Sequence, residues 1–140
     1  MDLSIFSQIN WIAVVVATLA YFLAGEIWYH KKVFGTKWAQ SHGIDLDDPE
    51  AKRGMGTGMV MAFITFAVIT IALSVLIVKL NLTLFISGVK LGLITGIGFS
   101  WATIYIAYLY SRKPSSVHFI DGLYHVAAQI IAAGILCSWR

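Results

Sequence analysis

The sequence predicts an all-α membrane protein with four transmembrane helices and short loops, forming a single domain over residues 1–140. Hydrophobic residues make up 59% of the chain and charged residues only 12%, whereas a soluble domain carries roughly 25% charged residues. The mean hydropathy is +0.79. Four stretches are long and apolar enough to cross a ~30 Å hydrocarbon core as helices of about 20 residues.

The four predicted spans cover about residues 9–29, 55–78, 88–110 and 117–136. An even number of spans places both termini on one side of the membrane. No basic residue precedes the first apolar run, so we expect this segment to remain as a helix rather than to be removed as a signal peptide. Asp48, Pro49 and Glu50 have the pattern of a helix start, which predicts that the second helix begins in water before its span.

Lysine and arginine residues are divided unevenly between the two sides of the predicted bundle. The loops after the first and third spans hold Lys31, Lys32, Lys37, Lys52, Arg53, Arg112 and Lys113, and the other side holds Lys79, Lys90 and Arg140. Short cytoplasmic loops carry the excess of basic residues. We therefore expect an integral protein of the plasma (cell inner) membrane with both termini outside.

Charge and cysteine content exclude several classes of protein. The formal net charge is only +3, too low for a phosphate-binding face, so no nucleic-acid partner is expected. The single cysteine, Cys137, excludes an internal disulfide and metal sites built on paired cysteines. The lipid bilayer is the expected partner, together with a small molecule or proton as ligand. No cofactor is identified.

Small residues recur at every fourth position in the third span. Gly88, Gly92 and Gly96 would lie on one helix face. Because lipid tails are as apolar as leucine, helices in a membrane associate through close backbone approach, which such a face permits. The face would pack either inside the chain or between copies of it. We expect a homo-oligomer through these glycines.

The last span carries four polar residues where lipid is expected: His118, Asp121, His125 and Gln129. At 100° per residue, Asp121 and His125 lie about 40° apart on one helix face. An aspartate facing lipid costs about 2.5–3.5 kcal/mol. This face should therefore point into the bundle.

Two residues of other spans lie at the same predicted depth as Asp121. Glu26 stands near the end of the first span, and Tyr105 stands near the end of the third. We expect both to meet Asp121 and His125 in one pocket in the cytoplasmic half of the membrane, where Asp121 and His125 share a proton or form a pair. The full set of predicted pocket residues is Asp121, Tyr124, His125, Gln129, Glu26, Tyr105, Asn10 and Trp28.

The chain resembles the small integral-membrane family of domain of unknown function 1761 over almost its whole length. The resemblance rests on short elements in a fixed order: Asn10-Trp11, Gly25, Trp28-Tyr29, Phe34-Gly35, Trp38, Pro114, Ile120-Asp121, Tyr124-His125, Gly134-Ile135 and Trp139. It implies a four-helix membrane protein without an agreed activity. It marks Asn10, Trp28, Tyr29, Phe34, Trp38, Asp121, Tyr124 and His125 as family-typical, whereas Glu26 and His118 depart from the family pattern.

Three interpretations of the polar face remain open. Asp121 and His125 could lock helices together, as in an accessory subunit without chemistry. They could line a path for protons or small solutes in a channel, carrier or proton-linked component, because histidine and carboxylates relay protons; this is the working prediction. They could form a chemical site: an enzyme for a lipophilic substrate with Asp121 or Glu26 as acid and His125 as base, or a metal site of His118, Asp121 and His125.

Overall fold

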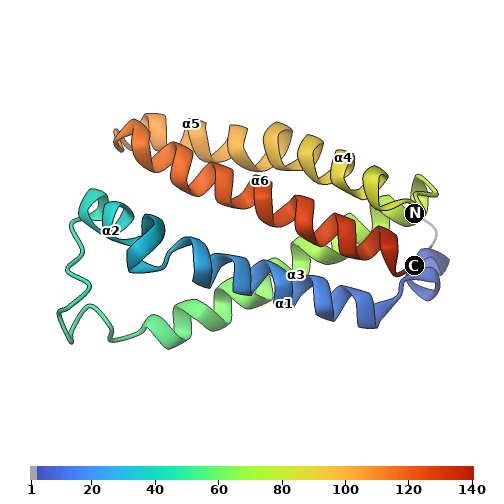
Figure 1. Ribbon diagram of the computed structural model, residues 1–140, viewed down its shortest axis with the longest axis horizontal. Helices are drawn as coiled ribbons and strands as arrows, with labels where there is room; N and C mark the ends of the chain where they lie inside the picture. The colour runs from blue at the N-terminus through green and yellow to red at the C-terminus, as the bar shows by residue number, and fades with distance from the viewer. Residues whose placement is uncertain (1–2) are drawn as a thin grey trace.

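The computed structural model describes residues 3–140, and its regular elements are all helical (Figure 1). Short 3-10 and π-helical pieces are labelled η. The elements are η1 (Leu3–Gln8), α1 (Trp11–Trp28), η2 (Lys31–Gly35), α2 (Thr36–His42), α3 (Met55–Lys79), α4 (Phe85–Thr95), η3 (Gly96–Trp101), α5 (Ala102–Tyr110) and α6 (Ser115–Ser138).

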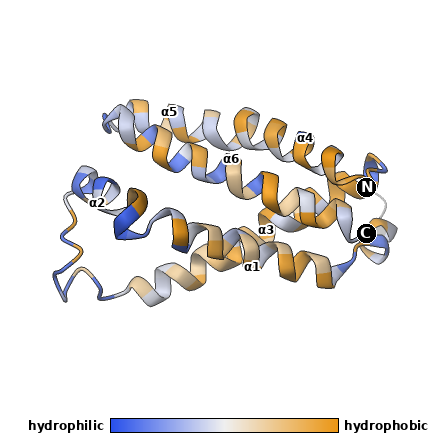
Figure 2. Cartoon of the chain, viewed as in Figure 1, coloured by the Kyte–Doolittle hydropathy of each residue, from blue (hydrophilic) through white to orange (hydrophobic). Residues whose placement is uncertain are grey.

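Four helical stretches are long and apolar enough to span a membrane, which confirms the predicted fold class. They are Trp11–Trp28, Met55–Lys79, Phe85–Tyr110 and Ser115–Ser138. The third stretch consists of α4, η3 and α5 in one line and begins three residues before the predicted start. In Figure 2 the hydrophobic colour follows these stretches, and the hydrophilic colour gathers at the connections.

The prediction that the second helix starts at Asp48 is wrong. The Asp48 carboxylate accepts a hydrogen bond from the backbone N–H of Glu50 at 2.9 Å, which closes a local turn instead of a helix. Gly54 follows with φ 84°, a left-handed conformation that glycine adopts readily and that ends any helical run. α3 therefore begins at Met55.

α6 is the central helix of the bundle and contacts α1, α3, α4, α5 and η3. Of the most apolar 18-residue window in each span, 61% is buried in α6 but only 22–28% in the other three. Small residues permit this position, because Ala128, Ala132 and Ala133 are fully buried and let neighbouring backbones approach.

The glycines of α4 and η3 that were predicted to form an oligomer seam pack against α6 inside the chain. A Cβ added at Gly92 would lie 2.5 Å from the carbonyl oxygen of Gln129. A Cβ at Gly96 would lie 2.8 Å from Val126 Cα, and one at Gly88 would overlap the carbonyl of Ala133. Close helix packing inside the chain accounts for the four-residue spacing.

η1 and the end of α6 lie at one end of the bundle, hereafter the terminal end, and α2 with its following loop lies at the other, hereafter the loop end (Figure 1). At the terminal end, the Asn10 side chain accepts hydrogen bonds from the N–H groups of Ile12 and Ala13 and so caps α1. Its amide also donates to the carbonyl of Trp139 at 3.0 Å, which ties the start of α1 to the end of α6.

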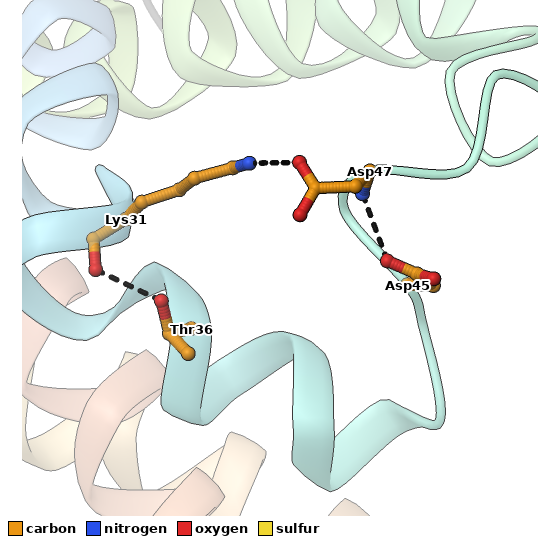
Figure 3. Close-up of polar contacts among 4 residues, drawn as sticks. All are labelled: Lys31, Thr36, Asp45 and Asp47. Atoms are coloured by element: carbon orange, nitrogen blue, oxygen red, sulfur yellow. Dashed lines mark hydrogen bonds and ion pairs between the residues drawn. The ribbon is translucent and has the colours of Figure 1, made fainter.

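The loop after α2 folds back onto η2 through a salt bridge (Figure 3). The Lys31 ammonium lies 2.5 Å from the Asp47 carboxylate. The hydrogen bond from Lys31 and its charge hold the pKa of Asp47 below its usual value. Local hydrogen bonds from Thr36 to the Lys31 carbonyl and from the Asp47 N–H to the Asp45 carboxylate hold both sides of this contact.

Candidate functional site

A series of polar side-chain contacts runs inside the bundle from the loop end to about its middle. We call it the polar series. It comprises Tyr29 and Tyr108 on Asp121, Tyr21 on His125, Ser100 on Gln129, and Thr18 on Thr70. Its members come from α1, α3, η3, α5 and α6, with Tyr29 at the end of α1.

Asp121 is the charged residue of the polar series and lies nearest the loop end. Its side chain is only 7% exposed, although it stands six residues after the start of α6. Tyr29 donates to one carboxylate oxygen at 2.6 Å and Tyr108 to the other at 2.7 Å. Two phenol donors thus satisfy both oxygens, which offsets part of the cost of burying a carboxylate.

No cation compensates this carboxylate within residues 3–140. The two salt bridges of the described chain join Lys31 to Asp47 and Arg53 to Glu50, all on exposed positions. An unpaired carboxylate in a poorly hydrated bundle is stable only when hydrogen bonds or a proton neutralise it. The two tyrosine hydroxyls are therefore the groups that satisfy the Asp121 carboxylate within the described chain.

His125 lies one helical turn deeper and has its own partner. The Tyr21 hydroxyl lies 2.7 Å from His125 Nδ1. Tyr124, between the two sites, donates to the backbone carbonyl of Tyr21 at 3.0 Å. Gly25 makes room for it, because a Cβ there would lie 2.8 Å from the Tyr124 hydroxyl oxygen.

The inner end of the polar series consists of neutral groups. Gln129 donates to the Ser100 hydroxyl at 2.5 Å. The Thr18 and Thr70 hydroxyls lie 2.7 Å apart, and each also reaches a carbonyl of its own helix. Beyond them toward the terminal end, α1, α3 and α6 bury Val14, Leu73, Ile77 and Leu136. The polar lining thus gives way to an apolar core about halfway through the bundle.

The predicted pair of Asp121 and His125 does not form, because each residue is held by tyrosines instead. Tyr29 and Tyr108 occupy both oxygens of Asp121, and Tyr21 occupies Nδ1 of His125. Residues four apart on one helix are within reach of each other, but here hydroxyl groups from neighbouring helices take these positions. Of the predicted pocket residues, Asp121, Tyr124, His125 and Gln129 lie together.

Glu26 and Tyr105 lie outside the polar series, contrary to the prediction. Glu26 is exposed on α1 and makes no hydrogen bond or salt bridge with the polar series. Tyr105 is 45% exposed and packs its ring edge against His118, with centroids 5.2 Å apart. The prediction placed these two residues beside Asp121 because they lie at a similar depth along their helices. Depth does not determine the direction in which a side chain points around the helix axis.

His118 is buried but does not belong to a metal centre. It is 5% exposed, lies between the rings of Tyr105 and Tyr108, and has no hydrogen-bond partner at either nitrogen in the described chain. No group of three His, Cys, Asp or Glu residues within residues 3–140 could hold a metal ion. The alternative of a metal site from His118, Asp121 and His125 is therefore wrong for this arrangement.

Two further predicted pocket residues act elsewhere. Asn10 lies at the terminal end, where it caps α1. Trp28 donates its indole N–H to the carbonyl of Ile120 at 3.0 Å rather than to Asp121. Both positions hold helix ends together rather than line the polar series.

Sequence reasoning missed five members of the polar series: Tyr21, Tyr108, Ser100, Thr18 and Thr70. Tyr21 carried a usable signal, because a tyrosine in the middle of a span needs a hydrogen-bond partner for its hydroxyl. Tyr29 was marked by the family resemblance, without a role. Ser100 and Tyr108 depend on η3, a π-helical turn that the apolar pattern of this span does not reveal.

Comparison with known proteins identifies a family without identifying an activity. Residues 12–137 match the family described as "Protein of unknown function (DUF1761)". No curated protein and no solved structure matches the chain. The match covers all four spans and the whole polar series.

Proposed function

The chain belongs to the DUF1761 family, and on that premise we propose that it is a small proton-linked membrane component whose proton-binding group is Asp121. The observation that carries the proposal is a buried carboxylate held by two tyrosine hydroxyls without a cation partner in the described chain. Ionisable residues inside a membrane bundle are costly and mark ion or proton pathways.

The neighbours of Asp121 support this role. Hydroxyl and imidazole groups both donate and accept hydrogen bonds, so they can pass a proton along. From Asp121 such groups continue inward at Tyr21 and His125, and then at the two threonines. Because an apolar core follows on the terminal side, protons would cross only when the bundle opens there, as in a gated pathway rather than an open pore.

We assign the loop end to the cytoplasmic side. The basic residues Lys31, Lys32, Lys37, Lys52 and Arg53 all belong to the connection between α1 and α3. Positive charge in short loops favours the cytoplasm. Asp121 would then exchange protons with the cytoplasm, and both termini would lie outside.

The enzymatic alternative receives less support from the arrangement. Acid–base catalysis needs both groups within hydrogen-bond reach of one substrate. Asp121 and His125 are each engaged by separate tyrosines, and Glu26, the second candidate acid, is exposed. The remaining alternative is that Asp121 only joins neighbouring helices, as in an accessory subunit. The experiment must distinguish this structural role from proton binding.

The proposal is tested by pH-difference infrared spectroscopy on the reconstituted protein, followed by proton flux into liposomes containing a pH-sensitive dye. We expect a carboxyl C=O band that appears at low pH and is absent from Asp121→Asn, together with flux above that of empty liposomes that Asp121→Asn abolishes. Glu26→Gln is the matched control, since it removes an exposed carboxyl near the same end.

Two results would overturn the proposal. If the band of Asp121 is absent at every pH at which the protein stays folded, the carboxylate never binds a proton and acts as a lock. If Asp121→Asn carries the same flux as wild type, protons cross without this residue.

A further inference from the structure

A pocket separate from the polar series opens on the side of the bundle where α1 ends and α6 begins. We call it the side pocket. Its volume is about 250 Å³. The wall from α1 and η2 consists of Trp28 and Phe34, and the wall from α6 includes Phe119, Ile120 and Leu123. Phe119 and Leu123 are 51% and 45% exposed, so the pocket faces the surroundings of the bundle rather than its core.

The inner wall of this side pocket is fixed before any ligand arrives. The Trp28 indole N–H donates to the carbonyl of Ile120 at 3.0 Å, which joins α1 to α6. The Phe34 ring packs on Trp28 with centroids 4.8 Å apart. A preformed wall lowers the ordering cost of binding.

The rim of the side pocket is cationic. Lys37 of α2 and the Ser116 hydroxyl of α6 are its polar lining, and no carboxylate lines it. Lys37 takes part in neither of the salt bridges found within residues 3–140. The pocket thus combines an apolar inner surface with an uncompensated positive charge at the level where a span ends.

We propose that this pocket binds an anionic phospholipid, with the phosphate against Lys37 and Ser116 and the first part of one acyl chain against Trp28, Phe119 and Leu123. Basic pockets between transmembrane helices bind anionic headgroups, and burial of chain methylenes adds affinity. The volume is below that of a pocket for a complete drug-sized ligand, as expected when most of the lipid stays in the bilayer. The site does not depend on the proposed role of Asp121.

The experiment is a titration of the intact protein in neutral detergent with dioleoylphosphatidylglycerol or dioleoylphosphatidylcholine, with bound lipid measured by native mass spectrometry. We expect the anionic lipid to bind about fivefold more tightly, the effect of one lysine near the headgroup. Lys37→Gln should remove this preference. Lys32→Gln, which removes an exposed lysine outside the pocket lining, should retain it.

A second variant tests the apolar part. Leu123→Trp adds bulk at a half-exposed pocket wall and should weaken both lipids while circular dichroism shows an unchanged helix content. Equal affinity for the two lipids, or equal losses in Lys37→Gln and Lys32→Gln, would overturn the headgroup assignment. Unchanged binding in Leu123→Trp would overturn the pocket itself. Displacement of the lipid by inorganic phosphate at equal concentration would show a free-anion site instead.

Discussion

Replacing Gly92 by alanine should destabilise the bundle although alanine is the better helix former. The added Cβ would lie 2.5 Å from the carbonyl oxygen of Gln129 and 2.6 Å from Ile130 Cα. Both are backbone atoms of α6, and they cannot rotate away as the end of a side chain can. The methyl group fits only if α4 and α6 move apart along their contact.

The expected size of the effect follows from two opposing contributions. Overpacking that shifts backbone costs typically about 1–3 kcal/mol. The change from glycine to alanine in a helix interior returns up to about 1 kcal/mol through helix propensity. Because the close contacts of Gly92 are with backbone, we expect a net loss of about 1–2 kcal/mol in the free energy of unfolding.

The assay is unfolding of Gly92→Ala in mixed detergent micelles, followed by circular dichroism, with light scattering to determine the oligomeric state of the folded protein. Gly58→Ala is the matched control, because a Cβ at this exposed position of α3 meets nothing within 4 Å. It should be as stable as wild type or more so. A Gly92→Ala protein with wild-type stability would refute the close packing of α4 on α6. A stable variant that loses a subunit would support the predicted oligomer seam.

Two further predictions concern the buried His118 and the exposed Asp47. His118→Leu should leave the free energy of unfolding unchanged or raise it by up to about 1–3 kcal/mol, because it removes two buried nitrogens without partners in the described chain. His125→Leu should lower it, because it removes one hydrogen-bond partner of the buried Tyr21 hydroxyl. A loss in His118→Leu in the same unfolding assay would reveal a partner for that ring. At the loop, Lys31 lowers the pKa of Asp47. The salt bridge therefore stabilises the loop fully when the pH is above the usual pKa of aspartate, and this stabilisation is lost as the pH falls through the lowered pKa of Asp47. Carbon-13 NMR titration of Asp47 should show a higher midpoint in Lys31→Gln and a smaller rise in Lys52→Gln, and equal midpoints in wild type and Lys31→Gln would contradict the contact.

The sequence was sufficient for the fold class because apolar length is a direct physical requirement for crossing a membrane. It was also sufficient to turn the polar face of α6 inward, since Asp121 and Gln129 would be costly against lipid, and both are buried. Element ends were predicted less well. α3 begins at Met55, directly after the left-handed Gly54. The residues around Asp48 have a more typical helix-start pattern, but no helix begins there.

Partners of the polar residues could not be predicted from one helix at a time. Asp121 and His125 both lie on α6, one turn apart, but the groups that contact them come from the neighbouring helices. Tyr29 and Tyr21 reach them from α1, as the contact between α1 and α6 allows. The glycine spacing in α4 was equally ambiguous, because close packing inside a chain and between chains needs the same small residues.

Tyr108, rather than the predicted Tyr105, contacts Asp121, and the cause lies in the backbone of the third span. η3 is a π-helical turn between α4 and α5, and such a turn inserts one extra residue into a helix. Every later residue then lags by about 100° around the axis. In an uninterrupted helix Tyr108 would point about 160° away from the direction of Gly92, and the lag reduces this angle to about 60°. Tyr108 thereby reaches Asp121, and Ser100 within η3 reaches Gln129. The irregular turn in the third span therefore supplies the second hydroxyl to Asp121, because it shifts the register that places Tyr108.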